Sequence, residues 1–294
     1  MDWGWIVNNW PSLIFLGTLL VLGMPHGAID HYLYFSARKR LITPKALMRF
    51  AGVYLLAAVV MTGFWLLFPG AAIWGLVLLT WFHWGDSDWI YEKNRGHKVP
   101  LVFGIWRGSL PMLVPLIGNS VAYLEVLATG VQVVNPEASL AGCELFQSGF
   151  FLPLLGVFLI ILGIINWSLI LRSPLMRKGS LRLLAEDLSL LLLFLLLPPL
   201  ASVGLYFAFW HSSRHIRLSA RIIGPPLEKE FKGVNWGRFY CMAFPFTAAG
   251  IILMVLLAWV ILGLRGAVST LLGSYLITLW ALTWPHAWVV RKSL

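Results

Sequence analysis

Long apolar stretches, separated by short polar segments, repeat along the whole chain. A helix needs about 20 mostly apolar residues to cross a bilayer. Windows of that kind occupy residues 11–36, 47–68, 71–91, 99–118, 150–171, 182–199, 201–222, 239–263 and 270–290. The pattern predicts an all-α, polytopic integral membrane protein with nine transmembrane helices.

Residues 119–149 do not fit this pattern as a full span. We expect them to form an extracytoplasmic loop, with a re-entrant or interfacial helix around Val121–Ala128 and a surface helix near Glu137–Gln147. The sequence has no internal repeat, low-complexity tract or soluble domain. Residues 1–294 are therefore predicted to form a single transmembrane helical-bundle domain.

The basic residues gather on one side of the predicted helices. Cytoplasmic loops carry an excess of Lys and Arg, and 20 of the 22 basic residues follow odd-numbered spans, leaving only Arg107 and Arg265 elsewhere. The N-terminus is therefore predicted outside and the C-terminus in the cytoplasm of a multi-pass protein of the cell inner (plasma) membrane. The first apolar stretch lacks a basic region before it and a small-residue cleavage site, so we expect a retained helix, not a signal peptide.

Composition excludes several classes of protein. Of the 294 residues, 59% are hydrophobic and 12% are charged, whereas soluble domains have roughly 25% charged residues. An ordinary cytosolic enzyme, a disordered protein and a nucleic-acid-binding module are excluded, the last despite a net charge of +10. Cys143 and Cys241 alone make neither a disulfide framework nor a thiolate metal site.

Six of the seven histidines lie in or at the edge of predicted spans, where ionisable groups are costly and mark functional sites. From the helical rise, His26 lies about 22 Å and His83 about 18 Å below the outer ends of their spans, and His211 and His215 about 15 and 21 Å. All four lie on predicted helices that cross the membrane from outside to inside. If these helices pack together, the four imidazoles therefore come to a similar depth. His211 and His215, four residues apart, also share a helix face, as two ligands of one metal ion require.

Two acidic residues close to these histidines in the sequence could accept hydrogen bonds from metal-bound imidazoles. Asp30 follows His26 by four residues and Asp86 follows His83 by three, and a ligating imidazole usually passes its other N–H to a carboxylate or carbonyl. Both aspartates also fit a plain role at the cytoplasmic helix ends. His31, about 140° around the helix from His26, is expected to miss the ion. His286 has a suitable depth, either as a near-site residue or as a hydrogen-bonding group that fixes its helix.

Imidazole ligands suit Fe, Zn, Cu or Ni. The absence of nearby cysteine argues against a thiolate site, and a neutral histidine quartet suits Fe(II) with positions open for dioxygen. Aromatic residues around the histidines are mostly anchors or core filling, but some are expected to line a slot for a long apolar substrate. The candidates are Phe82, Trp84, Tyr206, Phe207, Trp210 and Trp284.

Four motifs, taken in order, resemble those of the Brp/Blh family of membrane-embedded β-carotene 15,15′-dioxygenases. They are Pro25-His26-Gly27-Ala28-Ile29-Asp30-His31, Phe82-His83-Trp84-Gly85-Asp86, Trp210-His211-Ser212-Ser213-Arg214-His215 and Pro285-His286. The resemblance covers essentially the whole chain. It implies a non-haem Fe(II) held by His26, His83, His211 and His215, and cleavage of the central double bond of β-carotene with O2 to two all-trans-retinal molecules. Supply of retinal to a rhodopsin is a further implied role.

Three other functions stay open at this point. A membrane di-iron desaturase or hydroxylase uses about eight histidines, including HxxHH boxes, whereas this chain has seven and no adjacent pair. A transporter would use the histidines as a proton relay or metal pathway. A non-catalytic partner in opsin assembly would tolerate loss of His211, whereas the enzyme would not.

Overall fold

The computed structural model describes residues 3–140, 149–173, 179–225, 227–229, 233–261 and 267–294, with positions 142, 144, 146 and 177 between them. The first predicted span is a helix with two irregular points. α1 (Trp3–Thr18) continues through a π-helical turn, η1 (Leu19–Gly23), into α2 (Met24–Ala28) and then α3 (Asp30–Ala37). Pro25 stands in the first turn of α2, where a missing N–H is tolerated. Ile29, at φ −94° and ψ 6°, separates α2 from α3.

The next three helices follow the predicted windows closely. They are α4 (Pro44–Leu67), α5 (Pro69–Asn94) and α6 (Leu101–Gly118). Thr43 caps α4 by accepting a hydrogen bond from the Ala46 N–H, and a proline opens both α4 and α5, where its fixed φ favours the helix. Apolar runs bounded by these caps explain the agreement in boundaries.

A shorter helix, α7 (Ser120–Gln132), occupies the stretch expected to hold a re-entrant or interfacial piece. Asn119 caps it, and its 13 residues extend only about 20 Å, less than the thickness of a bilayer core. Residues 133–140 form turns and coil, so the surface helix expected near Glu137–Gln147 is not present in its first four residues. Positions 141, 143, 145 and 147 of that prediction lie outside the described residues.

The second half of the chain contains another broken helix. After α9 (Phe151–Arg172) and α11 (Ser180–Leu196), α12 (Pro199–Leu205) runs through the π-helical η2 (Tyr206–Ser212) into α13 (Ser213–Ile223). A small antiparallel hairpin, β1 (Glu228–Lys229) and β2 (Gly233–Val234), pairs Glu228 with Val234. α14 (Trp236–Leu256) with η3 (Leu257–Ile261), and α15 (Ala267–Ser293), complete the fold.

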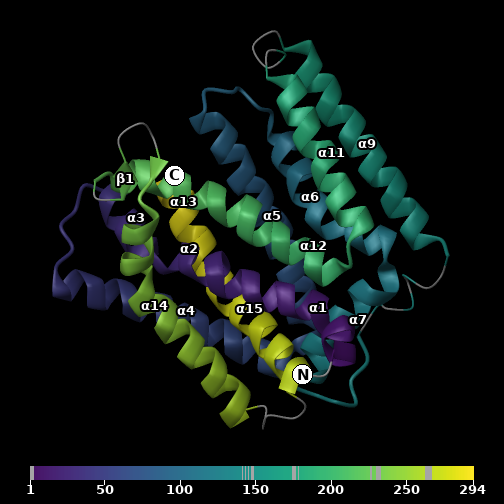
Figure 1. The fold of residues 1–294 in the computed structure, drawn as a ribbon, viewed down its shortest axis with the longest axis horizontal. Coiled ribbons are helices and arrows are strands. Elements are labelled where there is room, and N and C mark those ends of the chain that lie inside the picture. The colour runs from purple at the N-terminus through teal and green to yellow at the C-terminus, as the bar shows by residue number, and fades with distance from the viewer. Residues whose placement is uncertain are drawn as a thin grey trace.

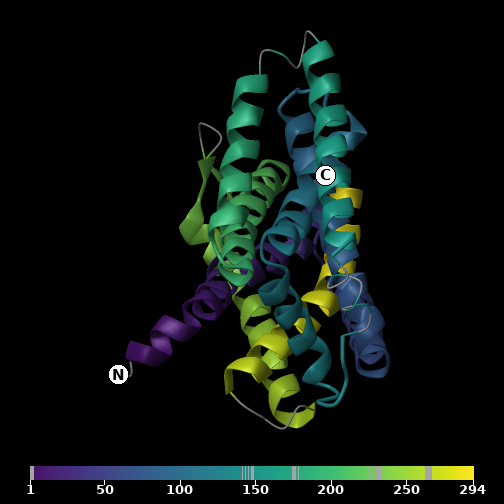
Figure 2. The ribbon, with the colours of Figure 1, turned by 90° about the vertical axis from the view of Figure 1, so that its right-hand side faces the viewer.

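The helices pack side by side around α15 and α5. In Figure 1, α9 and α11 both run alongside α6, which each of them contacts, while α15 crosses near α1. α15 packs against α3, α4, α5, α7 and α14. Figure 2 shows α9 and α11 at one end of the molecule, and the last part of α14 and the start of α15 at the other.

α5 and α6 approach unusually closely because glycines line their contact. A Cβ atom on Gly85 would lie 2.0 Å from the Gly104 carbonyl oxygen, and one on Gly108 would lie 2.0 Å from the Trp81 carbonyl oxygen. Small residues permit this backbone contact in membrane helices, where tight van der Waals packing holds helices together. The contact matters for the site because α5 carries His83.

Among the described residues, five helical segments are long and apolar enough to cross a membrane. They are Asn9–Ala37, Pro44–Leu67, Leu101–Gly118, Phe151–Arg172 and Trp236–Trp259. The structure therefore shows an all-α fold suited to a membrane. α11 has only 17 residues, and α5, α13 and α15 carry polar residues, so the count of nine spans stays a prediction. The predicted orientation of the termini across the membrane also stays a prediction. In Figure 1 the C-terminus lies near the hairpin at the upper left, and the N-terminus lies toward the lower right.

Candidate metal centre

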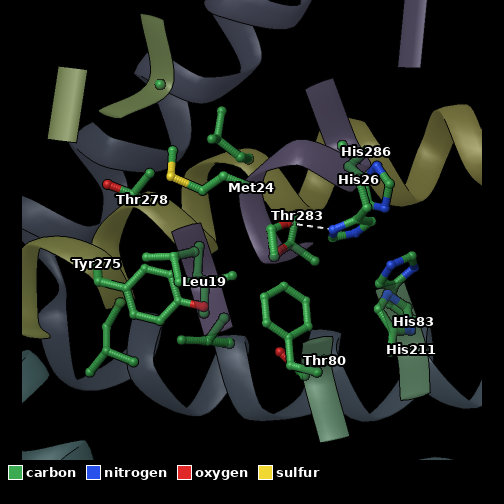
Figure 3. A pocket seen from close by; sticks show the side chains of 18 of the residues that line it. Leu19, Met24, His26, Thr80, His83, His211, Tyr275, Thr278, Thr283 and His286 are labelled. Carbon is green, nitrogen blue, oxygen red and sulfur yellow. Dashed lines mark hydrogen bonds between the residues drawn. The ribbon is translucent and has the colours of Figure 1, made fainter. Parts of the chain in front are cut away.

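Five histidines from five different segments meet in one place. His26 lies on α2, His83 on α5, His211 in η2, His215 on α13 and His286 on α15. Neighbouring rings have centroids 4.8–5.4 Å apart, and all five residues are at most 5% exposed. Figure 3 shows four of them grouped at one side of a cavity. The structure thus brings together the four sequence-predicted ligands and adds His286.

Hydrogen bonds fix the tautomer of at least two of these rings. The Nδ1–H of His26 donates to the Gly23 carbonyl and faces the Ser212 hydroxyl, with Nδ1 and Oγ 3.2 Å apart. The Nδ1–H of His286 donates to both carboxylate oxygens of Asp30, at 2.8 and 2.9 Å. A neutral imidazole that donates through Nδ1 leaves a lone pair on Nε2. Both rings are therefore prepared to bind a metal through Nε2.

The Nε2 atoms of all five histidines are buried and have no hydrogen-bond partner among the described residues. Buried polar atoms are nearly always paired, so five such atoms in one cluster call for an explanation. Ligand atoms of His26, His211 and His286 lie within 4.8 Å of one another, as do those of Asp30, His215 and His286. Since imidazole–metal bonds of about 2.1 Å put two ligand atoms at most about 4.2 Å apart, small ring rotations suffice. The residues fit a metal ion.

Asp30 acts on a different histidine from the one that its sequence spacing suggests. Its carboxylate accepts from His286 and from the Tyr54 hydroxyl, the latter at 3.0 Å. Ile29 separates α2 from α3, so the helix is not continuous from His26 to Asp30, and the Nδ1–H of His26 donates to the Gly23 carbonyl instead. Tyr54 had no distinguishing signal in the sequence.

The other near-site candidates lie further out. His31 packs against Tyr32 and Phe246, with ring centroids 4.0 and 4.5 Å apart, and lines the cavity beside the cluster. Asp86 lines a separate small pocket together with Arg291. Neither has the direct imidazole contact that Asp30 makes.

An apolar cavity of about 460 Å³ adjoins the histidine cluster. His26, His83, His211 and His286 form part of its wall, and α1, α4, α7, α12, α14 and α15 supply most of the remainder. Residues at its far side in Figure 3 include Tyr275 and Thr278 on α15. Tyr275 and His286 are eleven positions apart on this helix, about 16 Å along its axis. The cavity thus offers a long apolar space that ends at the imidazoles.

Only part of the aromatic set reaches this cavity. Trp84 and Phe207 line it, and their rings stack with centroids 5.6 Å apart beside His211. Tyr206 is buried behind Trp84, with the two ring centroids 5.1 Å apart. Phe82 and Trp284 are 61% and 53% exposed and lie outside the lining. Adjacent helical residues project about 100° apart, which explains why a ring next to a histidine in sequence faces away from it.

Trp210 belongs to a buried charge cluster that the sequence did not reveal. Its Nε1–H donates to Asp88 at 3.3 Å, and the Arg214 guanidinium lies over its ring, 4.0 Å from the centroid. Arg107, which is 0% exposed, is ion-paired with Glu186 and Asp187 at 2.9 and 3.0 Å. The only sequence signal was that Arg107 breaks the one-sided distribution of basic residues.

Two comparisons with known proteins identify the family. A family profile described as beta-carotene 15,15'-dioxygenase matches residues 18–292. The chain is also 30% identical over 291 residues to a probable beta-carotene 15,15'-dioxygenase Blh of Halobacterium salinarum, a match that covers 94% of this chain and 82% of that protein. No solved structure matches the chain. With a cluster of buried imidazoles beside a long apolar cavity, the chain belongs to the beta-carotene 15,15'-dioxygenase family and is a carotenoid-cleaving dioxygenase.

Proposed function

We propose that the chain binds one non-haem Fe(II) through His26, His83, His211 and His215 and uses O2 to cleave the central 15,15′ double bond of β-carotene to two all-trans-retinal molecules. The observation that carries this proposal is the convergence of unpaired, buried Nε2 atoms at the wall of an apolar cavity. His286 is the fifth imidazole of the cluster, and Asp30 orients it.

The overall reaction is balanced without an external reductant. The central C=C bond breaks, two C=O bonds form, and each aldehyde receives one oxygen atom of O2. An Fe(II) ion held by these histidines would bind and activate dioxygen beside the polyene, and the electrons that reduce O2 to the two aldehyde oxygens come from the cleaved C=C bond. Everything else in the reaction depends on how the protein holds its substrate.

The protein's own contribution is to bind and place the polyene. The cavity wall is mainly aliphatic and aromatic, so it accepts a hydrocarbon from the bilayer and excludes water from the histidine cluster. The Phe207 ring stacks on His211 and the Trp84 ring lies tilted against it, and both rings line the cavity beside this imidazole. Holding one bond of the polyene at the cluster fixes the position of cleavage, because a misplacement of about 1 Å is sufficient to slow a reaction strongly.

The carboxylate of Asp30 has two effects on the site. It keeps His286 in the tautomer with a free Nε2 lone pair, and its negative charge offsets part of the charge of a divalent ion surrounded by neutral imidazoles. The Tyr54 hydroxyl holds the carboxylate in place by donating to Oδ2 at 3.0 Å.

Expression in cells that accumulate β-carotene tests the reaction. We expect these cells to lose their orange colour and to accumulate all-trans-retinal, measured by chromatography of cell extracts. Persistent colour in the presence of folded, iron-loaded protein would refute the proposal. About one iron per purified chain supports a single centre, whereas two irons favour the di-iron desaturase or hydroxylase.

Single substitutions test the ligand set. We expect His26→Ala, His83→Ala, His211→Ala and His215→Ala each to abolish iron retention and retinal formation. His97→Ala is the matched control, because His97 lies in a polar loop and contacts Glu92, with Nδ1 and Oε2 2.7 Å apart. A normal iron content in one of the four variants removes that residue from the set. Normal retinal formation in the His211→Ala variant favours a non-catalytic opsin-assembly role instead.

The membrane placement is part of the same proposal. All nine predicted helices form one domain in the plasma membrane, with the N-terminus outside, and the substrate enters from the lipid bilayer. Cysteine labelling of residues near each end of the chain, carried out from the outside of intact cells, tests the orientation. Pigment formation in cells that also express a retinal-free rhodopsin tests whether the product reaches such a partner.

A further inference from the structure

A cluster of buried and half-buried charges connects four helices, two of which carry histidines of the metal centre. Asp88 lies on α5, Arg107 on α6, Glu186 and Asp187 on α11, and Arg214 on α13. None of the five lines the cavity. Their ion pairs join Arg214 to Asp88 and Glu186, and Arg107 to Glu186, Asp187 and, at 3.8 Å, Asp88.

The pair of Asp88 and Arg214 is the part of this cluster that connects two ligand-bearing segments. Nη1 of Arg214 donates to Oδ1 of Asp88 at 3.0 Å, while the Trp210 Nε1–H donates to Oδ2 at 3.3 Å. Nη2 of Arg214 lies 3.0 Å from Oε2 of Glu186. Both Asp88 and Arg214 are therefore paired on more than one side, which leaves little freedom for either.

Each partner lies close in sequence to the histidines. Asp88 is five residues after His83 on α5, about 7.5 Å along the helix axis. Arg214 stands between His211 and His215 and is directly followed by His215. The contact therefore sets how far the segment with His211 and His215 can slide or rotate against the helix with His83.

Charges at this depth have a high desolvation cost. Asp88 is 2% and Arg214 is 8% exposed, and apolar residues of similar volume often stabilise a core as well as a buried ion pair does. A directional contact between two helices, however, defines a single register in a way that apolar packing does not. Fixing that register is what these charges add to the fold.

We propose that Asp88 and Arg214 are positioning residues for the metal centre, which hold His83 in register with His211 and His215. The inference rests on the proposed function, because it assumes that these histidines bind an ion. The Asp88 carboxylate and the Arg214 guanidinium act through the helices that carry the ligands and do not touch the ion.

Asp88→Asn tests the inference, and Asp187→Asn is its matched control. Both variants remove one buried carboxylate charge from the same cluster, but Asp187 contacts Arg107, Trp106 and Trp167 and no residue of α13. We expect Asp88→Asn to weaken binding of Co(II), used as a spectroscopic probe for Fe(II), by roughly ten- to a hundredfold and to change its visible absorption bands. Asp187→Asn should keep the wild-type affinity and bands, even if its thermal midpoint falls.

Equal effects of the two variants on Co(II) binding would overturn the inference, and so would a wild-type affinity and spectrum in Asp88→Asn. Failure of the wild-type chain itself to bind Co(II) or Fe(II) refutes the proposed function instead, so the two failures are distinguishable. If Asp88→Asn does not fold, the comparison of Co(II) affinity between Arg214→Lys and Arg214→Gln tests the inference instead. Lysine keeps a charge for Asp88, so we expect part of the Co(II) affinity to return in Arg214→Lys relative to Arg214→Gln, and no difference between them would contradict the role.

Discussion

The close contact of α5 and α6 leads to a sharp prediction for Gly85→Ala. The added Cβ would lie 2.0 Å from the Gly104 carbonyl oxygen, whereas ordinary contacts begin at 3.4 Å. The obstructing atom belongs to the backbone of α6, so no side-chain rotation relieves the overlap. The two helices must separate locally by about 1.4 Å, the difference between these two distances.

Overpacking of this kind destabilises a core by about 1–3 kcal/mol. We expect the thermal midpoint of the purified protein in detergent to fall by roughly 2–10 °C, from the usual relation between free energy and melting temperature. Because His83 lies two residues from Gly85, the same displacement moves its ring, and a shift of about 1 Å at a reacting site costs about a hundredfold in rate.

Gly52→Ala is the matched control for this experiment. Gly52 also lies inside a helix, α4, but a Cβ there would meet no atom within 4 Å. Its thermal midpoint and retinal formation should equal or exceed those of the wild type, since alanine favours a helix. Should Gly85→Ala retain the wild-type midpoint and iron content, α5 and α6 do not pack as closely as described.

Two further substitutions examine the residues around the imidazoles. Asp30→Asn should lower the affinity for iron by roughly ten- to a hundredfold, because the site loses the negative charge that offsets part of the charge of the ion and the carboxylate that orients the fifth imidazole, His286; an unchanged iron titration would argue against this role. Trp84→Ala should reduce the rate of retinal formation, since its ring lines the cavity beside His211, whereas Phe82→Ala should not, because that side chain is 61% exposed. Equal rates in these two variants would show that the wall at Trp84 does not hold the substrate.

Much of the fold could be predicted because hydrophobic length is a local property. α4, α5 and α6 begin and end within a few residues of the predicted windows, since each is an apolar run bounded by proline, polar caps or charges. The depth of the histidines also followed from the helical rise, which is why a cluster was expected. The rotation of each helix about its own axis was not predictable, so Phe82 and Trp284 were expected in the cavity and lie outside its lining.

The errors concerning polar partners have a common physical cause. Pairing Asp30 with His26 assumed an unbroken helix, whereas Ile29 separates α2 from α3 and the Asp30 carboxylate accepts from His286, 256 positions away. The role of Asp88 depends on Arg214, which is 126 positions away in the chain. Contacts between distant segments depend on tertiary packing, which a single sequence does not display.

Two of the five clustered imidazoles lie far apart in the sequence. His26 is on α2, early in the chain, and His286 is on α15, the last helix. During biosynthesis, therefore, the cluster of five imidazoles is incomplete until α15 has been synthesised and has packed against α2 and α5. We therefore expect the proposed metal site to be completed late in the maturation of this protein, and chains that stop before α15, which lack His286, to hold the ion more weakly than the full chain.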